Sequence, residues 1–476
     1  MKIMTRTEKT IAIIGGGIAG LSAAHVLQEE IEERKEAITF SLVEKESRLG
    51  GSILTERYDD FIIEGGPDCF LSEKPEAIAL CHKLGIQDHL IKTNEHVRRI
   101  FILSKGTLRE LPEGFMLLAP TNFSSFIKNP LISPLGKLRM TMDLIIPAKK
   151  SAEEESLAQF VTRRLGKEVL EKIAEPLVAG IHASDPENMS LKSTFPRLIE
   201  LEKNYRSLII GMIKRKKMFK AKRDTNDYTM FMSLKEGLAT LPNTVAALLN
   251  PKALLTGSPV MSIEKVSDAS GYLLTLAKGD LLKVMSVVFA TPAFVTADLF
   301  KEIDPVLSSE LFSLPYVSTA TISLAYERKA ISYPMNGFGF VIPRIENRRI
   351  MACTWTSRKF AHRAPDDKLL IRCFVGGIKN EHLTRLKESA LIAIAREELR
   401  DIMGIHAEPL FTKVFRWEKS MPQYMVGHEA KIKRIEERLS LNPGLFLAGS
   451  AYHGIGISDC IKSGEKAALA ALKSLL

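Results

Sequence analysis

The chain has 476 residues, of which 45% are hydrophobic and 26% charged, and its formal net charge is +10. This length exceeds what one ordinary hydrophobic core supports, so we expect two or three domains in a folded, soluble protein. The positive charge favours anionic substrates or an acidic membrane surface as partners. Because no nucleic-acid-binding motif accompanies the charge, we expect no nucleic-acid partner.

The cysteine pattern and the N-terminus indicate where the protein works. The five cysteines form no CxxC pair, which argues against a zinc site, a disulfide scaffold and thioredoxin-like chemistry. The start, MKIMTRTEKT, is too polar for a secretory signal, and no stretch approaches the roughly 18 apolar residues of a membrane-spanning helix. We therefore expect a reducing, cytoplasmic location in which any membrane contact is peripheral. The cysteines are Cys69, Cys81, Cys353, Cys373 and Cys460.

The first motif, IAIIGGGIAGLSAAHVLQEE, places GxGxxG between an apolar strand and a helix that we predict to begin near Ile18. In this context Gly15 permits a tight turn, Gly17 lets the backbone approach a pyrophosphate, and Gly20 lets the helix pack on the strand. The helix start, with Ile18 and Ala19, offers free N–H groups and a positive dipole end to the phosphates. The motif therefore predicts a dinucleotide-binding site.

The next predicted strand, AITFSLVEK, ends at Glu44 and Lys45. The interval from the first glycine is longer than the usual ~20 residues, and the polar insertion EEIEERKEA accounts for the excess. We expect the Glu44 carboxylate to accept hydrogen bonds from the ribose hydroxyls of an adenosine half. The alternative interpretation is a solvated glutamate at the end of a strand.

A second glycine pair follows this strand directly. In EKESRLGGSILT, Arg48, Gly50 and Gly51 are placed to close on the same pyrophosphate, and FIIEGGPDCF then brings Gly65 and Gly66. The spacing ExxxRxGG resembles that of the flavin amine oxidase, phytoene desaturase and protoporphyrinogen oxidase superfamily. Members of this superfamily bind FAD, so the resemblance implies FAD as the cofactor.

The C-terminal stretch GLFLAGSAYHGIGISDCIKSGEKAALAALKSLL predicts a strand, a glycine loop and a helix that runs to the chain end. In the resembled superfamily this loop and helix N-terminus lie beside the flavin, which implies contacts from Gly449, Gly456, Ile457 and Ser458. A positive helix end near the pyrimidine side of the ring would stabilise the anionic reduced flavin. Alternatively, Ser458 and Asp459 are helix caps whose side chains do not touch flavin.

Further segments extend the resemblance. RWEKSMPQY has Trp417, Pro422 and Tyr424 in the spacing WxxxxPxY, similar to a flavin-proximal segment of these oxidases. LKEGLATLP, around Gly237, resembles the stretch where the chain returns to the nucleotide domain, and the family residue that matches Val260 contacts the adenine end through its backbone. The expected cofactor-binding residues are Gly15, Gly17, Ile18, Ala19, Gly20, Glu44, Lys45, Arg48, Gly50, Gly51, Gly65, Gly66, Val260, Trp417, Gly449, Gly456, Ile457 and Ser458.

These separated segments predict an α/β fold: a discontinuous Rossmann-like FAD-binding domain with a mixed β-sheet substrate domain and a helical insertion. The middle is helical in pattern, broken by the loop-like PTNFSSFIKNPLISPLGK, and is followed by β-rich segments such as ATISLAYERKAI and GFGFVIPR. The expected boundaries are 1–75, 226–298 and 425–476 for the three parts of the FAD-binding domain, 76–225 for the mainly helical, substrate- and membrane-facing insertion, and 299–424 for the β-rich substrate domain.

In the middle of the chain the resemblance narrows to the porphyrinogen oxidases of haem synthesis. EPLVAGIHASDPENMS resembles a family block EPLxxGIYAGDPxxLS, from which His182 and Ser184 depart. The resemblance implies six-electron oxidation of protoporphyrinogen IX or coproporphyrinogen III to the porphyrin, with successive hydrides passing to the flavin and O2 as acceptor. Because the flavin does this chemistry, we expect no acid–base constellation and no metal.

One arginine is a candidate for substrate binding. Arg99, in VRRIFIL, matches the position at which some members of the family pair an arginine with a substrate propionate. Its neighbour Arg98 leaves this alignment ambiguous by one residue. The alternative for Arg99 is a solvated surface arginine.

The span IIGMIKRKKMFKAKR combines seven basic residues with apolar ones. It is either a solvated segment or a segment that binds anionic lipid electrostatically at a membrane surface. The basic residues are Lys214, Arg215, Lys216, Lys217, Lys220, Lys222 and Arg223.

Taken together, these features predict an FAD-dependent porphyrinogen oxidase, monomeric or homodimeric. An amine oxidase or a carotenoid desaturase on the same nucleotide domain is the alternative enzyme. Amine oxidases often attach their flavin to a cysteine, and no Cys precedes Gly454 in GSAYHGIG, so we do not expect covalent attachment. A third hypothesis is a flavoprotein that carries porphyrin without turnover.

Overall fold

The computed structural model describes residues 3–4, 9–112, 115–116, 119–120, 129–151, 153–222, 228–266 and 271–476. Its nucleotide-binding part is built on a five-stranded parallel sheet, because short apolar segments rich in Ile and Val form strands that are buried on both faces. In sheet order, the strands are β13 (Leu254–Leu255), β3 (Ile38–Val43), β2 (Lys9–Ile14), β17 (Ser286–Phe289) and β23 (Leu445–Leu447).

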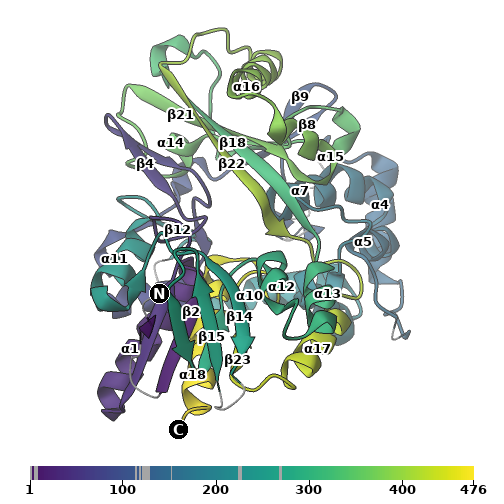
Figure 1. Ribbon diagram of the computed structural model, residues 1–476. Coiled ribbons are helices and arrows are strands. Elements are labelled where there is room, and N and C mark those ends of the chain that lie inside the picture. Colours follow the sequence, from purple (N-terminus) through teal and green to yellow (C-terminus); the bar gives the residue numbers. More distant parts are fainter. Residues whose placement is uncertain are drawn as a thin grey trace.

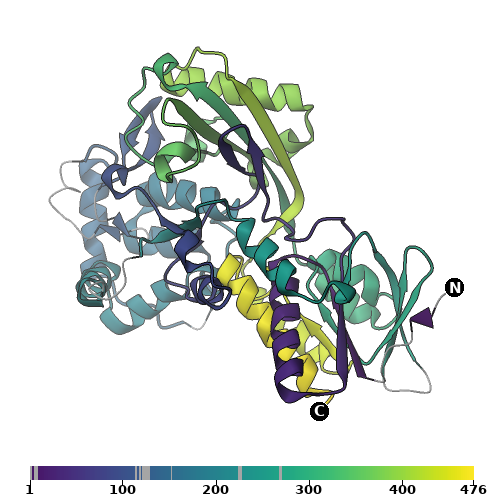
Figure 2. The ribbon, with the colours of Figure 1, turned by 90° about the vertical axis from the view of Figure 1, so that its left-hand side faces the viewer.

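This sheet joins distant parts of the chain, since β17 pairs with β2 on one side and with β23 on the other. Two long helices, α1 (Ile18–Arg34) and α18 (Ile457–Lys473), lie side by side against it (Figures 1 and 2). A Cβ atom at Gly464 of α18 would lie 2.0 Å from the backbone oxygen of Ala19, so glycine permits this close approach. The predicted discontinuous α/β fold is confirmed, and α1 begins at the predicted residue.

The other face of the parallel sheet packs against a four-stranded sheet and three helices, around one apolar cluster that includes Phe289 and Phe300. The four strands, in sheet order, are β1 (Ile3–Met4), β16 (Leu281–Val284), β15 (Tyr272–Leu276) and β14 (Val260–Lys265). The helices are α12 (Ala293–Phe300), α13 (Pro305–Phe312) and α17 (His428–Leu439).

A seven-stranded mixed sheet forms the upper part of the molecule in Figure 1, with α16 (Glu388–Met403) packed on it. All neighbouring strands in this sheet are antiparallel except β19 and β8. The strands, in sheet order, are β22 (Phe411–Pro422), β18 (Tyr316–Glu327), β21 (Lys368–Gly376), β20 (Ala352–Thr354), β19 (Gly339–Val341), β8 (Ile100–Ser104) and β9 (Thr107–Glu110).

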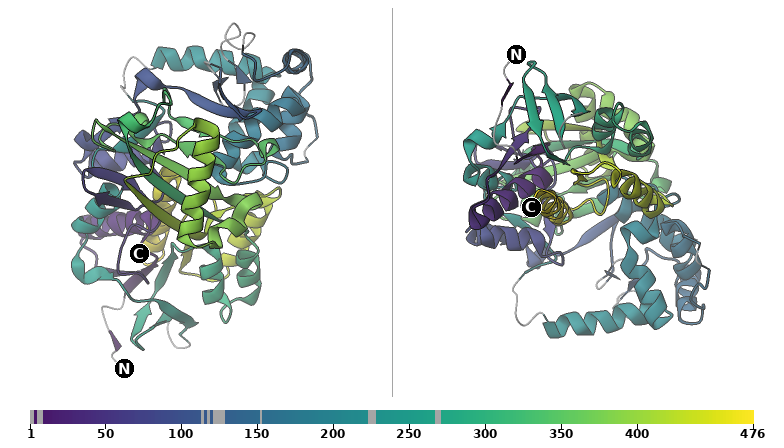
Figure 3. Two further views of the ribbon diagram at one scale, coloured as in Figure 1. Left: turned by 90° about the horizontal axis from the view of Figure 1, so that it is seen from above. Right: turned by 60° about the horizontal axis from the view of Figure 1, so that its bottom comes forward.

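A helical unit with its own apolar core projects from the rest of the molecule, as Figure 3 shows. The buried ion pair between Asp143 and Arg164, both fully buried, ties its short helices together, and Asp143 also accepts a hydrogen bond from the Ile209 N–H (3.0 Å). Its helices are α4 (Pro134–Thr141), η3 (Met142–Leu144), α5 (Leu157–Leu165), α6 (Lys167–Val169), η4 (Leu170–Ala174), α7 (Glu175–His182), α8 (Leu191–Thr194), α9 (Pro196–Tyr205) and α10 (Leu208–Lys222).

Small strands and helices connect these parts. The strands are β4 (Thr55–Tyr58) with β5 (Phe61–Glu64), β6 (Phe70–Leu71) with β12 (Phe231–Leu234) and β7 (Leu90–Lys92), and β10 (Phe115–Met116) with β11 (Ala119–Pro120). The remaining helices are α2 (Glu76–Lys83), η1 (Gln87–His89), η2 (Glu95–Val97), α11 (Thr240–Leu248), η5 (Pro251–Ala253), η6 (Arg328–Ala330), η7 (Arg344–Glu346), α14 (Thr356–Lys359), α15 (Gly377–Asn380) and η8 (Glu381–Arg385).

The structure distributes the segment 76–225 over three cores. Helix α2 packs beside α18, where the Ala77 N–H donates to the Ser458 hydroxyl (3.3 Å). Strands β8 and β9 join the seven-stranded sheet, because β8 pairs with β19 and β9 pairs with β8 as the edge strand. Residues 134–222 form the helical unit. The helical pattern of the middle thus lies in this later stretch, while residues 76–110 contribute to the two neighbouring parts.

Candidate active site

The glycine turn at the end of β2 forms a cradle above the parallel sheet. Gly15 has φ +109°, and its N–H donates to the Val43 carbonyl (2.8 Å), so the chain turns sharply at the strand end. A Cβ atom at Gly20 would lie 1.9 Å from the Gly15 oxygen, which shows how closely α1 approaches the turn. At Gly17, the residue that caps α1, an added Cβ atom would meet no other atom within 4 Å.

Glu44 lies beside this cradle. One carboxylate oxygen accepts a hydrogen bond from the Gly16 N–H (2.6 Å) and the other from the Glu46 N–H (2.9 Å), which fixes the side chain at the strand end. The Ser258 N–H donates to the Glu44 carbonyl (2.9 Å), so the chain that leads to Val260 passes the same point. The structure thus gathers the residues expected around an adenosine half.

The loop after Glu44 closes the cradle from the opposite side. The Gly50 N–H donates to the Gly16 carbonyl (2.8 Å), and a Cβ atom at Gly51 would lie 3.0 Å from the Gly17 Cα atom. Arg48 donates to the carbonyls of Ile53 (3.1 Å) and Gly51, so its guanidinium group holds the loop in shape. The exposed Lys45 ammonium group pairs with Glu46 (3.4 Å).

The N-terminus of α18 reaches the same region from the C-terminal end of the chain. Asp459 accepts a hydrogen bond from the Gly456 N–H (3.1 Å) and forms an ion pair with Lys74, so it caps the helix and ties it to the segment before α2. The buried Ser458 hydroxyl donates to the Lys74 carbonyl (3.1 Å). Gly449 has φ +114°, which the glycine loop before the helix requires.

The Gly65–Gly66 pair is pressed between the nucleotide-binding part and the seven-stranded sheet. The Gly65 carbonyl accepts hydrogen bonds from the Trp417 indole N–H (2.9 Å) and the Thr321 hydroxyl (3.1 Å), both on strands of that sheet. A Cβ atom at Gly66 would lie 1.8 Å from the Ser52 carbonyl oxygen, so only glycine fits there. The pair therefore lies where the two parts of the molecule meet.

A buried group of charges surrounds this junction. The Arg372 guanidinium group, 3% exposed, donates to the carbonyls of Gly65 (3.2 Å) and Gly66. Lys359 donates to Asp68 (2.9 Å) on the segment that follows the glycine pair. Although burial opposes ionisation, the Lys359 and Arg372 cations hold the pKa of Asp68 well below its usual range. These contacts fix the position of the glycine pair from the side of the seven-stranded sheet.

The end of α7 contacts the segment that follows β22. The His182 carbonyl accepts a hydrogen bond from the Gln423 amide (3.2 Å), and its ring packs edge-to-face against Phe195. Burial, with the nearby Lys74 charge, lowers the pKa of His182 to about 4. At Ser184 the hydroxyl oxygen is buried and has no hydrogen-bond partner. Of the two departures from the family block, His182 therefore contacts the residue that follows β22.

His182 makes the stability of the fold depend on pH. It is neutral when folded but takes up a proton below about pH 6.5 when unfolded, so stability is fully present above pH 6.5 and is lost towards pH 4. We expect His182→Tyr to reduce the loss of stability between pH 7 and pH 5 by about 1–2 kcal/mol. Urea unfolding at both pH values measures this loss, and His406→Gln, at an exposed histidine, is the control. If His182→Tyr loses as much unfolding free energy between pH 7 and pH 5 as wild type, His182 is not the group that makes stability depend on pH.

The arginines at the start of β8 have different partners. Arg99 is 53% exposed, and its Nε atom lies 3.6 Å from a Glu110 carboxylate oxygen. Its carbonyl accepts a hydrogen bond from the Phe338 N–H (2.8 Å), which positions it beside β19. Arg98 pairs with Glu95 (3.2 Å). Each arginine thus has a carboxylate partner, and the longer distance is that between Arg99 and Glu110.

Several of these contacts join segments that are distant in sequence and were not predicted. Lys74 carries no local signal, because its partner Asp459 is distant in sequence. Arg372 does carry one, since an arginine inside the apolar strand segment LLIRCFVGG needs buried partners. Within the described ranges, no group of three or more His, Cys, Asp and Glu side chains is arranged to hold a metal ion, and no helix is both long and apolar enough to cross a membrane.

The cradle fits a dinucleotide. Space remains at Gly17, where other turn residues are in close contact, and the N-terminus of α1 presents N–H groups that lack partners within the helix. The Glu44 carboxylate beside the turn is an acceptor of the kind that would hold a ribose, and Gly65–Gly66 with the N-terminus of α18 would hold the rest of the cofactor. The residues present are therefore those that an extended FAD molecule needs.

The family model of the flavin containing amine oxidoreductases matches residues 18–472. The chain belongs to this family, which confirms the expected oxidoreductase class and the FAD cofactor.

The individual relatives carry names of particular enzymes within this family. The coproporphyrinogen III oxidase of Bacillus subtilis (strain 168) is 37% identical over 474 residues, which cover 99% of this chain and 100% of that protein. The chloroplastic protoporphyrinogen oxidase of Nicotiana tabacum is 29% identical, with 97% of this chain and 85% of that protein covered. A crystal structure of a protein from Exiguobacterium sp. 255-15 has a TM-score of 0.87 at 30% identity, covering 99% of this chain and 100% of that one.

Proposed function

We propose that the protein is an FAD-dependent porphyrinogen oxidase of haem biosynthesis, which removes six electrons from coproporphyrinogen III with O2 as acceptor. The observation that carries this proposal is the similarity to the Bacillus subtilis enzyme over the full length of both chains. Protoporphyrinogen IX is the second candidate substrate, because the tobacco relative with that name also matches nearly the whole chain.

The protein's own residues have distinct tasks in this proposal. The glycine turn, Glu44 and the N-terminus of α18 bind the cofactor, which supplies a hydride acceptor when bound. The substrate macrocycle lies between the Gly65–Gly66 pair and the end of α7, where the exposed apolar side chain of Ile181 is available for contact. Arg99 pairs with one propionate of the substrate.

The growth of porphyrin fluorescence tests the activity. Purified protein in air receives coproporphyrinogen III or protoporphyrinogen IX in separate cuvettes, with heat-inactivated protein as the control. We expect both to be oxidised faster than in the control, and coproporphyrinogen III to react faster. Equal rates in the active and heat-inactivated samples, with flavin still bound, would overturn the proposal.

We expect Arg99→Leu to raise KM for coproporphyrinogen III about tenfold and to change kcat little. The reason is that a charge-assisted contact to a propionate contributes about 1.5 kcal/mol to substrate binding but does not touch the reacting atoms. Steady-state kinetics measure this effect, and Arg98→Leu is the matched control because that side chain pairs with Glu95. Equal KM values for Arg99→Leu and wild type would remove Arg99 from the substrate site.

An apolar surface on the helical unit supports peripheral contact with an anionic membrane. Leu135, Leu138 and Ile145 on α4 and the following residues are 78%, 65% and 77% exposed. The first turn of α10, the helix that carries the basic span, lies next to η3, as the hydrogen bond from Ile209 to Asp143 shows. An apolar surface combined with cations of the same unit is typical of proteins that bind at the lipid surface without spanning it. Of the basic span, the side chains of residues 216–222 and all of Arg223 lie outside the described residues.

Sedimentation with vesicles tests this contact. We expect wild-type protein to bind vesicles of mixed phosphatidylglycerol and phosphatidylcholine, and the double change Leu138→Glu with Ile145→Glu to reduce binding at least tenfold. Leu441→Glu, at a residue that is 62% exposed elsewhere on the surface, is the matched control. Vesicle binding that survives the double change would show that this surface does not contact lipid.

A further inference from the structure

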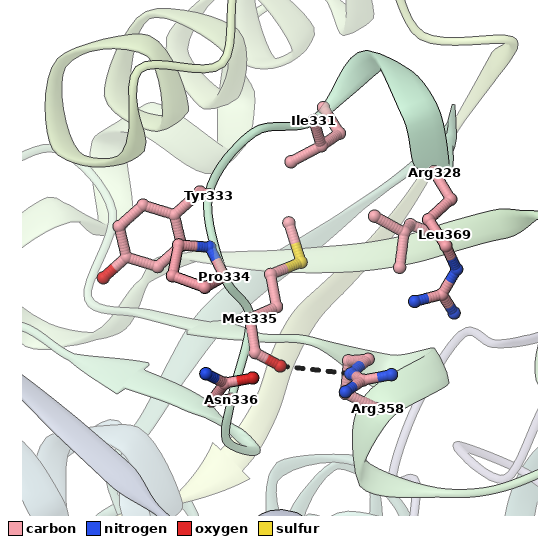
Figure 4. Close-up of a pocket in the computed structure, with 8 residues that line it drawn as sticks. All are labelled: Arg328, Ile331, Tyr333, Pro334, Met335, Asn336, Arg358 and Leu369. Carbon is pink, nitrogen blue, oxygen red and sulfur yellow. Dashed lines mark hydrogen bonds between the residues drawn. The ribbon is translucent and has the colours of Figure 1, made fainter.

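A cavity of about 170 Å³ lies at one end of the seven-stranded sheet (Figure 4). Its lining comes from the loop between β18 and β19, from α14 and from the start of β21. None of the residues expected to bind cofactor lines it, and neither does Arg99. The cavity is therefore separate from the candidate active site.

Two arginines lie on the same side of this cavity (Figure 4). The Arg358 Nε–H donates to the Met335 carbonyl (3.1 Å), and the Arg328 Nε–H donates to the Asp366 carbonyl (2.8 Å). In each arginine the Nε–H group makes this bond to the backbone. The terminal nitrogens of both groups remain for another acceptor, because in the described parts of the chain neither arginine forms an ion pair with a carboxylate.

The carboxylates close in sequence to the cavity pair with a lysine and not with the two arginines. Burial and the nearby Arg328 charge both lower the pKa of Arg358. The acidic side chains of Glu327 and Asp367 are close in sequence to the cavity, but both pair with Lys368. Elsewhere in the same part of the molecule, Arg348 pairs with Glu398 (2.6 Å). Two arginines without a carboxylate at one cavity therefore favour an anion from outside the chain.

The rest of the lining is apolar. Ile331, Tyr333 and Met335 lie away from the two cations, Leu369 lies beside Arg328, and Met335 and Leu369 are buried (Figure 4). An engineered cavity of about 150 Å³ in another protein holds benzene, so this volume suits a body of about one ring. Inorganic phosphate would leave the apolar wall without a partner.

We propose that this cavity binds a small amphipathic carboxylate, with the anionic head on Arg328 and Arg358 and the apolar part against Tyr333, Met335 and Leu369. Such a group is either a free organic acid or the propionate arm of a larger molecule at the surface. The proposal does not depend on the porphyrinogen oxidase activity, because it uses no residue of that site.

Isothermal titration of the FAD-loaded protein with 3-phenylpropionate tests the site. We expect one molecule to bind with a Kd of about 1 mM or below, and Arg328→Gln and Arg358→Gln each to weaken binding at least about tenfold. The uncharged 3-phenylpropionamide and inorganic phosphate are expected to bind at least tenfold more weakly than the acid. Arg396→Gln, at an exposed arginine that pairs with Glu408, is the matched control.

The binding results distinguish a carboxylate site at this cavity from nonspecific binding. Binding of the acid that persists in both arginine variants, or equal binding of acid and amide, would overturn the proposal, as would the absence of binding at about 10 mM. If Arg358→Gln does not fold, the exposed Arg328→Gln decides the matter. Competition by coproporphyrin III would identify a propionate arm as the occupant, and no competition would identify a free acid; both results support an amphipathic carboxylate site.

Discussion

Replacing Gly17 with alanine is expected to lower the affinity for FAD at least about 100-fold while the stability of the apoprotein stays unchanged. Gly17 has φ −71° and ψ 178°, a conformation that alanine adopts without strain. An added Cβ atom meets no protein atom within 4 Å, so the methyl group occupies only the space left for the cofactor. The variant therefore separates cofactor binding from folding.

Flavin fluorescence titration of the apoprotein measures the affinity, and urea unfolding measures the stability. Gly20→Ala is the contrasting variant, because its Cβ atom would lie 1.9 Å from the Gly15 oxygen and must disturb the turn itself. We expect that variant to lose stability as well as FAD. If Gly17→Ala binds FAD as tightly as wild type, the pyrophosphate does not lie at this turn.

Replacing Arg372 with methionine is expected to lower the free energy of unfolding by about 3–5 kcal/mol, since it breaks a buried charged network by removing one member. The Gly66 carbonyl loses its donor, the Gly65 carbonyl keeps only Trp417 and Thr321, and Asp68 keeps only Lys359 as a close cation. We also expect weaker FAD binding, because the sheet then holds the glycine pair through Gly65 alone.

Denaturant unfolding of the apoprotein gives the first effect, and flavin titration gives the second. Arg372→Lys keeps the charge but replaces the planar guanidinium group, whose Nη2 atom donates to both carbonyls, with a shorter-reaching ammonium group, so it is expected to recover only part of the stability. Arg396→Met, which removes an exposed ion pair, is expected to cost less than about 1 kcal/mol. A cost for Arg372→Met as small as that of the exposed control would show that this arginine does not hold the glycine pair.

The parts of the fold that the sequence predicts are those with local causes. The glycine turn follows directly from a strand, three glycines and a helix, so Gly15, Gly17 and Gly20 lie where the motif places them. The discontinuous nucleotide domain also follows, because its last strand and helix carry their own pattern in residues 444–476. Such local patterns need no knowledge of the remaining chain.

Contacts between distant segments could not be predicted in the same way. The pairing of β8 with β19 joins residues from two separate stretches, and no local pattern distinguishes it from a free hairpin. The ion pair between Lys74 and Asp459 and the placement of Arg372 on Gly65 likewise depend on how the two parts of the molecule meet. Tertiary packing, rather than propensity, decides these positions.

Anaerobic mixing of the FAD-loaded protein with coproporphyrinogen III tests the central claim most directly. The account predicts that the oxidised-flavin absorbance disappears without formation of the porphyrin, because one flavin accepts only two of the six electrons. Admission of O2 then restores the oxidised flavin, and porphyrin fluorescence grows over repeated cycles. Bound flavin that stays oxidised in the presence of coproporphyrinogen III and of protoporphyrinogen IX would contradict the assignment as a porphyrinogen oxidase.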